Sequence, residues 1–152
     1  MNKQRKVIFF GCSMRGGYGQ VTKDDLAQFP VIIQELGHKL ASLHQTGDWK
    51  ISEAPLSETQ IHDRDYAWLI DSDIGIFEIS NPSLGVGGEI SDLIHLGKPI
   101  LCLYKRGLVD QVSAYIRGKQ GSQYVSSSFE VQPYETKADI KNIIKNYLDS
   151  QP

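Results

Sequence analysis

The stretch IGIFEISNPSLGVGGEISDLIHLG, residues 74–97, decides the fold. Its first part, Ile74 to Ile79, is mostly apolar and predicts a buried strand, while apolar residues recur at helical spacing from Ile90 to Leu96. A glycine-containing loop joins the two, so backbone N–H groups at the helix start are placed to bind an anion. Glu89 is expected in the first turn of this helix, on its apolar side. A carboxylate there is either an inert partner of the helix dipole, worth roughly 0.3–1 kcal/mol, or a catalytic group, and we favour the catalytic interpretation.

Size and composition indicate one globular domain, residues 1–152, with 40% hydrophobic and 22% charged residues. The net charge of -2 and the absence of a basic block argue against nucleic acid as a partner. No apolar run approaches the roughly 20 residues of a membrane span, so no membrane partner is expected. The apolar run after the basic N-terminus is too short for a signal peptide, which predicts a cytoplasmic protein. Cys12 and Cys102 offer neither a disulfide framework nor a metal motif, and we expect no metal or other cofactor.

Strand and helix patterns alternate along the chain. Strands are expected at 6–10, 39–44, 74–79, 99–104 and within 123–131, and helices at 24–36, 57–70, 86–96, 109–116 and 137–148. Pro30 predicts a kink or a later start of the first helix, and Ser57 with Gln60 forms a capping-box pattern. This order predicts an α/β fold with a doubly wound parallel sheet and helices on both faces. In such sheets ligands bind beyond the carboxyl ends of the strands.

The loop after the first strand, GCSMRGG at 11–17, has the groups that a phosphate needs. Glycines allow the backbone to approach a ligand, Ser13 offers a hydroxyl and Arg15 a forked cation. The loop is neither a P-loop nor a dinucleotide fingerprint, and alone it is compatible with an ordinary turn. The Ser83 loop repeats the same chemistry, and two such loops at one sheet edge are more specific than either alone.

Asp65 is the second candidate catalytic carboxylate. It falls within an apolar stripe of the 57–70 helix, while His62, Asp63 and Arg64 are expected to point elsewhere. A carboxylate in that position is either functional or part of a structural ion pair with an arginine. Two carboxylates facing one cleft suit glycosidic bond cleavage, and a neighbouring anion site implies a phosphorylated glycoside.

Four segments together resemble the nucleoside 2-deoxyribosyltransferase superfamily, and within it the nucleoside 5′-monophosphate N-glycosidases. They are GCSMRGG at 11–17, the helix with Asp65, SNPSLGVGGEI at 80–90 and GKPILCLY at 97–104, and the similarity runs from about Val7 to Gly118. The resemblance implies a flavodoxin-like, Rossmann-like fold with five parallel strands and a homodimer with shared active sites. It also implies that Glu89 is a nucleophile forming a covalent glycosyl ester, that Asp65 is its acid/base and orienting partner, and that no metal takes part.

The same resemblance implies a substrate site for a nucleoside monophosphate. The residues expected to contact the substrate are Phe9, Cys12, Ser13, Met14, Arg15, Gly16, Gly17, Ser83, Gly85 and, from the partner subunit, Ser113, and His44 joins them through its expected place at the end of the second strand. His44 is the least specific of these, because its expected place at a strand end fits ligand contact and solvent exposure equally well.

The chain departs from the family pattern at two positions. The order Gly11-Cys12 replaces a small residue followed by glycine, and Phe9 stands where the hydrolase branch usually has tyrosine. Without that hydroxyl, we hypothesise that the preference for deoxyribose is relaxed and that ribonucleotides such as CMP become substrates.

Three other functions compete with a hydrolase. A deoxyribosyltransferase needs no phosphate site, which Ser13, Arg15, Ser83 and Ser113 provide. A phosphoribohydrolase of the cytokinin-activating type needs a glycine–threonine motif that this chain lacks. A nucleotide sensor without turnover has no need of both carboxylates. The sequence leaves the preferred base and the physiological pathway open.

Overall fold

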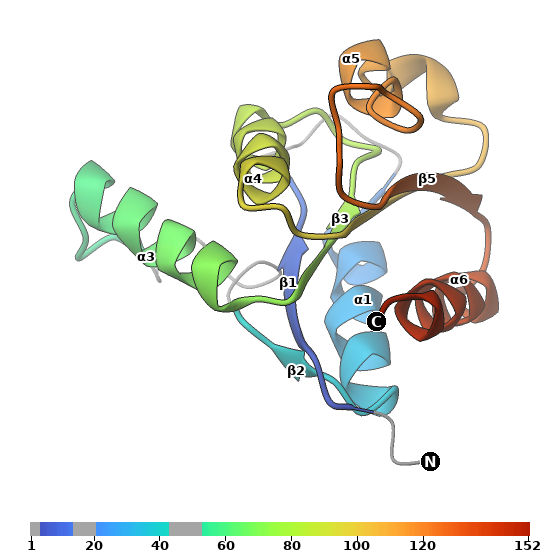
Figure 1. Ribbon diagram of the computed structural model, residues 1–152, viewed down its shortest axis with the longest axis horizontal. Coiled ribbons are helices and arrows are strands. Elements are labelled where there is room, and N and C mark those ends of the chain that lie inside the picture. Colours follow the sequence, from blue (N-terminus) through green and yellow to red (C-terminus); the bar gives the residue numbers. More distant parts are fainter. Residues whose placement is uncertain (1–3, 14–20, 43–52) are drawn as a thin grey trace.

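The computed structural model describes residues 4–13, 21–42 and 53–152. The five strands are β1 (Val7–Gly11), β2 (Lys39–Leu40), β3 (Ile74–Glu78), β4 (Ile100–Lys105) and β5 (Phe129–Tyr134). They form one parallel sheet in the order β2-β1-β3-β4-β5 (Figure 1). This order is that of the flavodoxin-like doubly wound fold, and it confirms the predicted α/β architecture.

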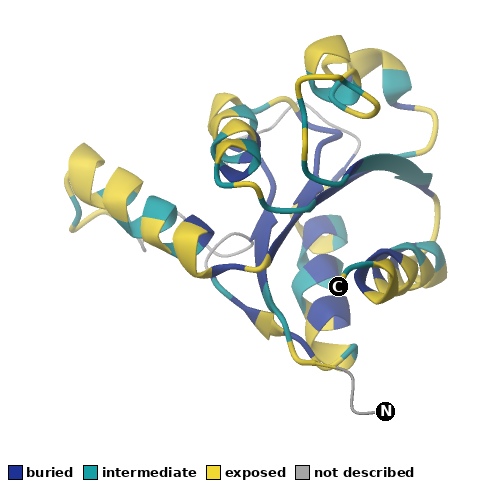
Figure 2. Ribbon diagram, in the orientation of Figure 1, coloured by how far each residue is buried: buried dark blue, intermediate teal, exposed yellow. Residues whose placement is uncertain are grey.

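Helices cover both faces of the sheet. They are α1 (Lys23–Glu35), α3 (Glu58–Asp71), α4 (Leu84–His95), the 3-10 turn η2 (Val109–Gln111), α5 (Ala114–Arg117) and α6 (Lys137–Ser150). Helices α1 and α6 pack on one face, and α3, α4 and α5 lie on the other (Figure 1). In a parallel sheet both faces of each strand are then buried, which explains the continuous apolar runs of β1, β3 and β4 (Figure 2).

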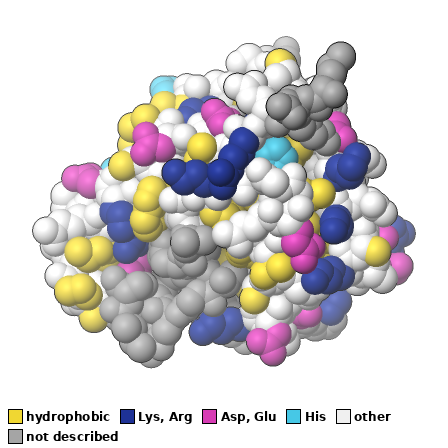
Figure 3. Space-filling view, turned by 90° about the horizontal axis from the view of Figure 1, so that it is seen from below, with side chains coloured by type: hydrophobic (Ala, Val, Ile, Leu, Met, Phe, Trp, Pro, Cys, Tyr) yellow, Lys and Arg dark blue, Asp and Glu magenta, His cyan; other side chains and the backbone are white. Residues whose placement is uncertain are grey.

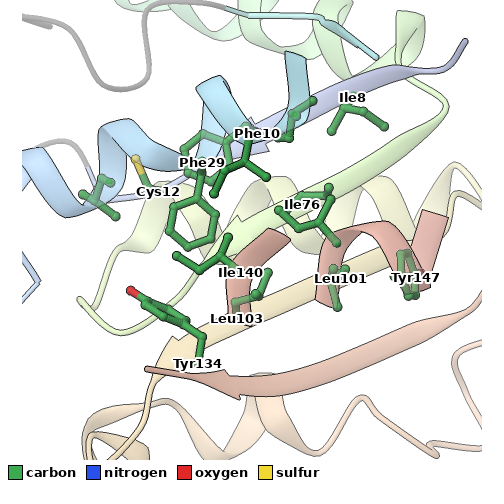
Figure 4. Packing of buried hydrophobic residues seen from close by; sticks show 14 of the residues in the cluster. Ile8, Phe10, Cys12, Phe29, Ile76, Leu101, Leu103, Tyr134, Ile140 and Tyr147 are labelled. Carbon is green, nitrogen blue, oxygen red and sulfur yellow. The ribbon is translucent and has the colours of Figure 1, made fainter. Parts of the chain in front are cut away.

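Each face has its own hydrophobic core. On the α1/α6 side, the ring of Phe10 stacks on that of Phe29 with centroids 5.2 Å apart, and Phe29 meets the edge of Tyr134 at 5.6 Å (Figure 4). On the other side, Phe9 and Phe77 pack with centroids 5.8 Å apart among residues of α3 and α4. Because side chains alternate along a strand, Phe9 and Gly11 share the α3/α4 side of β1.

Side chains at the helix starts explain where three helices begin. Thr22, Ser57 and Thr136 accept hydrogen bonds from the backbone N–H groups three residues later, and the side chains at those later positions bond back to the backbone of the cap. The capping box predicted from Ser57 and Gln60 is thereby confirmed. Helix α1 starts at Lys23 and runs through Pro30, so the predicted alternative of a later start is wrong.

Other predicted boundaries differ from the structure. Strand β2 comprises Lys39–Leu40, and Ala41 N–H still donates to the carbonyl of Ile8 at 2.8 Å, whereas residues 43 and 44 of the predicted strand lie outside the described residues. The helix expected at 109–116 is interrupted at Val112, where the backbone is extended. The last strand, at 129–134, begins within the predicted window of 123–131, extends three residues past its end, and continues through Pro133 at the edge of the sheet.

The surface carries both charges. On the face seen in Figure 3, basic and acidic side chains are interspersed, as expected for a net charge of -2. Within residues 4–13, 21–42 and 53–152, no helix is long and apolar enough to cross a membrane. The same part of the chain contains no group of three or more His, Cys, Asp or Glu side chains that could hold a metal ion.

Candidate active site

Glu89 reaches from α4 to the carboxyl end of β1. If Gly11 carried a Cβ atom, that atom would lie 3.0 Å from Oε2 of Glu89 and 2.5 Å from the ring of Phe77. Gly11 pairs with Phe77 of β3, and it is between β1 and β3 that the strand order of this fold reverses. The carboxyl group of Glu89 therefore lies at the position where doubly wound sheets bind their ligands.

Glu89 is half-buried as a residue, but its Oε2 atom is inaccessible to solvent and has no hydrogen-bond partner among residues 4–13, 21–42 and 53–152. The pKa of Glu89 is raised to about 8, mainly by burial and in addition by the negative charges of Asp65 and Asp92. A buried carboxyl group that lacks a partner is costly for the fold, so its retention points to a function.

The position of Glu89 in its helix differs from the prediction. Helix α4 begins at Leu84, two residues earlier than expected, because Ser83 caps it by accepting a hydrogen bond from Val86 N–H at 3.2 Å. Glu89 is consequently beyond the first turn. The helix dipole acts mainly within that first turn, so the inert interpretation of Glu89 loses its basis.

Asp65 lies on α3, close enough for its charge to act on Glu89. Its charge contributes to the raised pKa of Glu89, so the two carboxyl groups interact. Asp65 also forms an ion pair with Arg64, whose Nη2 and Nε atoms lie 2.8 and 2.9 Å from Oδ1. The prediction that Arg64 points elsewhere was therefore wrong. The long arginine side chain can turn back along the helix to a neighbouring carboxylate, which the angular spacing of residues does not reveal.

The start of α4 is open to a ligand. A Cβ added at Gly85 would lie 3.8 Å from Ser83 Oγ, and one added at Gly87 or Gly88 would meet nothing within 4 Å. Glycine within a helix costs about 1 kcal/mol relative to alanine, and packing gives no reason for it here. Space for a ligand close to the backbone is a reason that fits the helix N-terminus.

Ser83 and Ser113 line one groove of about 570 Å³ between α4 and α5. Ser113 caps α5 by accepting a hydrogen bond from Ile116 N–H at 3.4 Å. The rim carries two strongly exposed apolar side chains, Leu84 at 99% and Tyr115 at 77% exposure. Ser83 and Ser113 therefore line the same groove of one chain, although the sequence analysis assigned Ser113 to the partner's site.

The residues after β1 are described only in part. Phe9 is fully buried on the same side of β1 as Gly11, Cys12 is 3% exposed on the opposite side, and Ser13 is 8% exposed. Burial raises the pKa of the Cys12 thiol to about 12, with Glu78 and Glu89 adding to the shift, so this thiol is not a nucleophile at neutral pH. Met14, Arg15, Gly16, Gly17 and His44 lie outside the described residues, and their contacts remain predictions.

Sequence reasoning missed a buried polar network beneath the loop that follows β3. Glu78, only 2% exposed, accepts hydrogen bonds from Ser80 N–H and Ser80 Oγ–H and from the hydroxyl of Tyr134. Ser80 in turn accepts from Lys105 N–H at 2.8 Å, and its carbonyl accepts from Gln111 at 2.7 Å. These bonds fix the loop to β4, β5 and η2 and so orient the start of α4. The signal in the sequence was a single charged residue within an apolar strand.

Comparison with known proteins identifies the family. No family model matches the chain. The 5-hydroxymethyl-dUMP N-hydrolase of Mus musculus is 33% identical over 152 residues, which cover 94% of this chain and 80% of that protein. A Nematostella vectensis protein, provisionally named 2′-deoxynucleoside 5′-phosphate N-hydrolase 1, is 33% identical over 96% of this chain and 95% of its own length. The chain belongs to the 2′-deoxynucleoside 5′-phosphate N-hydrolase family. The resemblance drawn from the four sequence segments is thereby confirmed.

Solved structures agree on the fold of this N-hydrolase family member. The CMP N-glycosidase BcmB of Clostridium botulinum superposes with a TM-score of 0.65 at 20% identity, covering 93% of this chain and 99% of that one. A conserved protein of Enterococcus faecalis V583 superposes with a TM-score of 0.52 at 14% identity. At these identities the similarity supports the flavodoxin-like fold, while the family assignment rests on the sequence relatives.

Proposed function

We propose that the protein hydrolyses the N-glycosidic bond of nucleoside 5′-monophosphates, giving the free base and the sugar 5-phosphate. The observation that carries this proposal is the buried Oε2 of Glu89 at the carboxyl end of β1, which has no hydrogen-bond partner in the described part of the chain and is affected by the charge of Asp65. Relatives at about one third identity are named as N-hydrolases of deoxynucleoside 5′-phosphates, which is the same reaction class.

In the first half of the reaction Glu89 acts as the nucleophile. The raised pKa means that its carboxyl group is largely protonated in the free enzyme at neutral pH, so it must first give its proton to Asp65. The carboxylate then forms a bond to C1′ while the bond from C1′ to the base nitrogen breaks. The electron pair leaves with the base, which receives the proton from Asp65.

In the second half of the reaction a water molecule displaces Glu89 from C1′ of the sugar. Asp65 takes a proton from the water as its oxygen bonds to C1′ and the ester bond to Glu89 breaks. The carboxylate of Glu89 then recovers the proton from Asp65, and the enzyme is ready for another cycle. Two displacements at C1′ give overall retention of configuration.

The phosphate is proposed to bind at the two glycine-containing loops. Ser83, Gly85 and the first N–H groups of α4 contribute one side, supported by the open space above the glycines. Ser13, Arg15, Gly16 and Gly17 contribute the other side, as the family pattern implies.

We further propose a homodimer in which Ser113 reaches the partner's phosphate. Leu84 and Tyr115 support it, because a monomer would leave two large apolar side chains in water beside the groove that holds Ser83 and Ser113. The two cysteines, both free and buried, are compatible with a reducing compartment, and we propose that the enzyme acts in the cytoplasm.

The sugar preference is proposed to depend on Phe9. Its ring is fully buried next to Phe77, on the side of β1 that faces Glu89 and Asp65. A phenylalanine there provides no hydroxyl for the sugar, so we propose that ribonucleotides such as CMP are accepted besides deoxyribonucleotides.

The test is chromatographic detection of free base from a panel of ribo- and deoxyribonucleoside 5′-monophosphates. Release of base and sugar 5-phosphate without an acceptor base supports a hydrolase. Base exchange between unphosphorylated deoxynucleosides would support a transferase, and tight binding without release would support a sensor. Comparable turnover of CMP and dCMP supports the role of Phe9, whereas a strong preference for dCMP contradicts it.

A further inference from the structure

The guanidinium group of Arg64 contacts three side chains at once. Its Nε atom donates to Oδ1 of Asp65 at 2.9 Å, and Nη2 forms an ion pair with the same oxygen at 2.8 Å. Nη2 also lies 3.1 Å from Oε1 of Glu53, which precedes α3. The central carbon of the guanidinium lies 4.8 Å from the ring centroid of Trp68, one turn further along α3.

This arrangement differs from a surface ion pair. The side chains of Glu53, Arg64 and Asp65 are 12%, 21% and 20% exposed, whereas those of the surface pair Arg106 and Glu135 are 61% and 63% exposed. Shielding from water strengthens each contact, and the second carboxylate and the aromatic ring restrict the guanidinium. A planar fork held on three sides can in turn fix the carboxylate that it binds.

The fold explains why the carboxylate of Asp65 needs to be held in a fixed orientation. Asp65 lies on α3, which extends away from the sheet and has Leu69 as its one fully buried residue, with Tyr66 and Trp68 partly buried against the core (Figure 2). This packing holds the helix by its apolar side chains and does not by itself fix the carboxyl group of Asp65. Yet Asp65 must act on Glu89, which belongs to α4, and small displacements of a catalytic group cost large factors in rate.

We propose that Arg64 is a positioning residue for the reaction: held by Glu53 and Trp68, it fixes Asp65 in the orientation in which it exchanges a proton with Glu89. The inference rests on the proposed function. Arg64 acts through Asp65 and need not touch the substrate, so its loss should lower kcat far more than it raises KM.

The experiment compares four variants with the wild type on the best substrate of the nucleotide panel, and adds Asp65→Asn for a rescue test. Arg64→Gln removes the charge and the fork, Arg64→Lys keeps the charge alone, and Glu53→Gln weakens the support of Arg64. Arg106→Gln is the matched control, since it breaks an exposed arginine–carboxylate pair far from the site in sequence. Thermal melting of each variant verifies that it is folded.

The proposal predicts that Arg64→Gln lowers kcat by at least about tenfold with KM changed less than about threefold. Glu53→Gln should lower kcat by a smaller factor, Arg64→Lys should be intermediate, and Arg106→Gln should equal the wild type. Added guanidinium ion should partly restore kcat in Arg64→Gln but not in Asp65→Asn.

Two results would overturn the proposal: a kcat of Arg64→Gln within about twofold of the wild type, or a loss confined to KM. If Arg64→Gln does not fold, Glu53→Gln and Arg64→Lys decide, and wild-type kcat in both would be equally contradictory. These failures differ from failure of the proposed function, in which the wild type itself releases no base.

Discussion

Gly11 and Glu89 meet at the carboxyl end of β1, where a Cβ on the glycine would approach Oε2 of the glutamate to 3.0 Å. The two residues are far apart in the chain and belong to different elements, a strand and a helix. Their contact links the fold to the chemistry, because the absent side chain of Gly11 makes room for a buried carboxyl group at the ligand edge of the sheet.

Replacing Gly11 should damage the protein more than replacing a glycine of α4. In Gly11→Ala the new methyl group would lie 2.5 Å from the Phe77 ring, which forces a shift in the core and costs about 1–3 kcal/mol of unfolding free energy. Gly88→Ala meets no atom within 4 Å and should be as stable as the wild type or slightly more stable. Urea unfolding of both variants checks this, and equal stability of the two would contradict the tight contact at Gly11.

Glu89 should destabilise the folded protein increasingly as the pH rises. Below about pH 4.5 the group is protonated in both states and costs nothing in charge. Between about 4.5 and about 8 the unfolded chain releases the proton while the folded protein keeps it, and the folded state loses up to about 1.4 kcal/mol per pH unit. The loss is complete above the folded-state pKa.

The variant Glu89→Gln removes this titration. Its unfolding free energy should therefore exceed that of the wild type by a margin that grows from about pH 5 to about pH 8.5, reaching a few kcal/mol at most. Denaturant unfolding of both proteins at a series of pH values measures the margin. A margin independent of pH would show that Glu89 has an ordinary pKa.

Breaking the Glu78 network should loosen the loop that positions α4. Glu78→Gln places an amide NH₂ group where the carboxylate accepts from Ser80 and Tyr134, so donors are left buried without acceptors, at a cost of about 1–3 kcal/mol. Tyr134→Phe removes one donor and should cost less. The control Glu135→Gln changes an exposed carboxylate and should be nearly neutral. Chemical unfolding provides the measurement, and a neutral Glu78→Gln would refute a structural role of the network.

Leu84→Glu should disrupt the proposed dimer. The side chain is 99% exposed in the single chain, so a charge there does not disturb the core, but it would be buried in an interface. Sedimentation equilibrium should show a dimer for the wild type and a weakened dimer for the variant, with reduced base release. Tyr124→Glu, at an exposed position that does not line the groove, is the control. A wild-type monomer with full activity would contradict shared active sites.

Local signals in the sequence account for most of the fold. The capping box of Ser57 and Gln60 marks a helix start that the structure confirms, and Gly37 and Gly97, both with positive φ, follow the ends of α1 and α4. Element boundaries that depend on tertiary contacts were harder to predict from the sequence. Strand β2 pairs with β1 at the edge of the sheet, and the early start of α4 follows from the cap at Ser83, which was assigned to ligand binding instead.

The sequence likewise predicted only some of the residues of the candidate site. Anomalous charge on an apolar face was enough to single out Glu89 and Asp65. The supporting residues were hidden because their roles depend on contacts across the sheet, as for Glu78 and Tyr134, or on the path of a long side chain, as for Arg64. The spacing of Arg64 and Trp68, four residues apart on one helix, was the available sign of their contact.

The most direct test of the account compares base release by Glu89→Gln and Asp92→Asn with that of the wild type. Both variants remove one carboxylate from α4, but only Glu89 reaches the carboxyl end of β1. The account predicts that Glu89→Gln loses at least about a thousandfold in kcat, while Asp92→Asn stays close to the wild type. A Glu89→Gln enzyme that still releases base at a rate near that of the wild type would show that Glu89 is not the nucleophile.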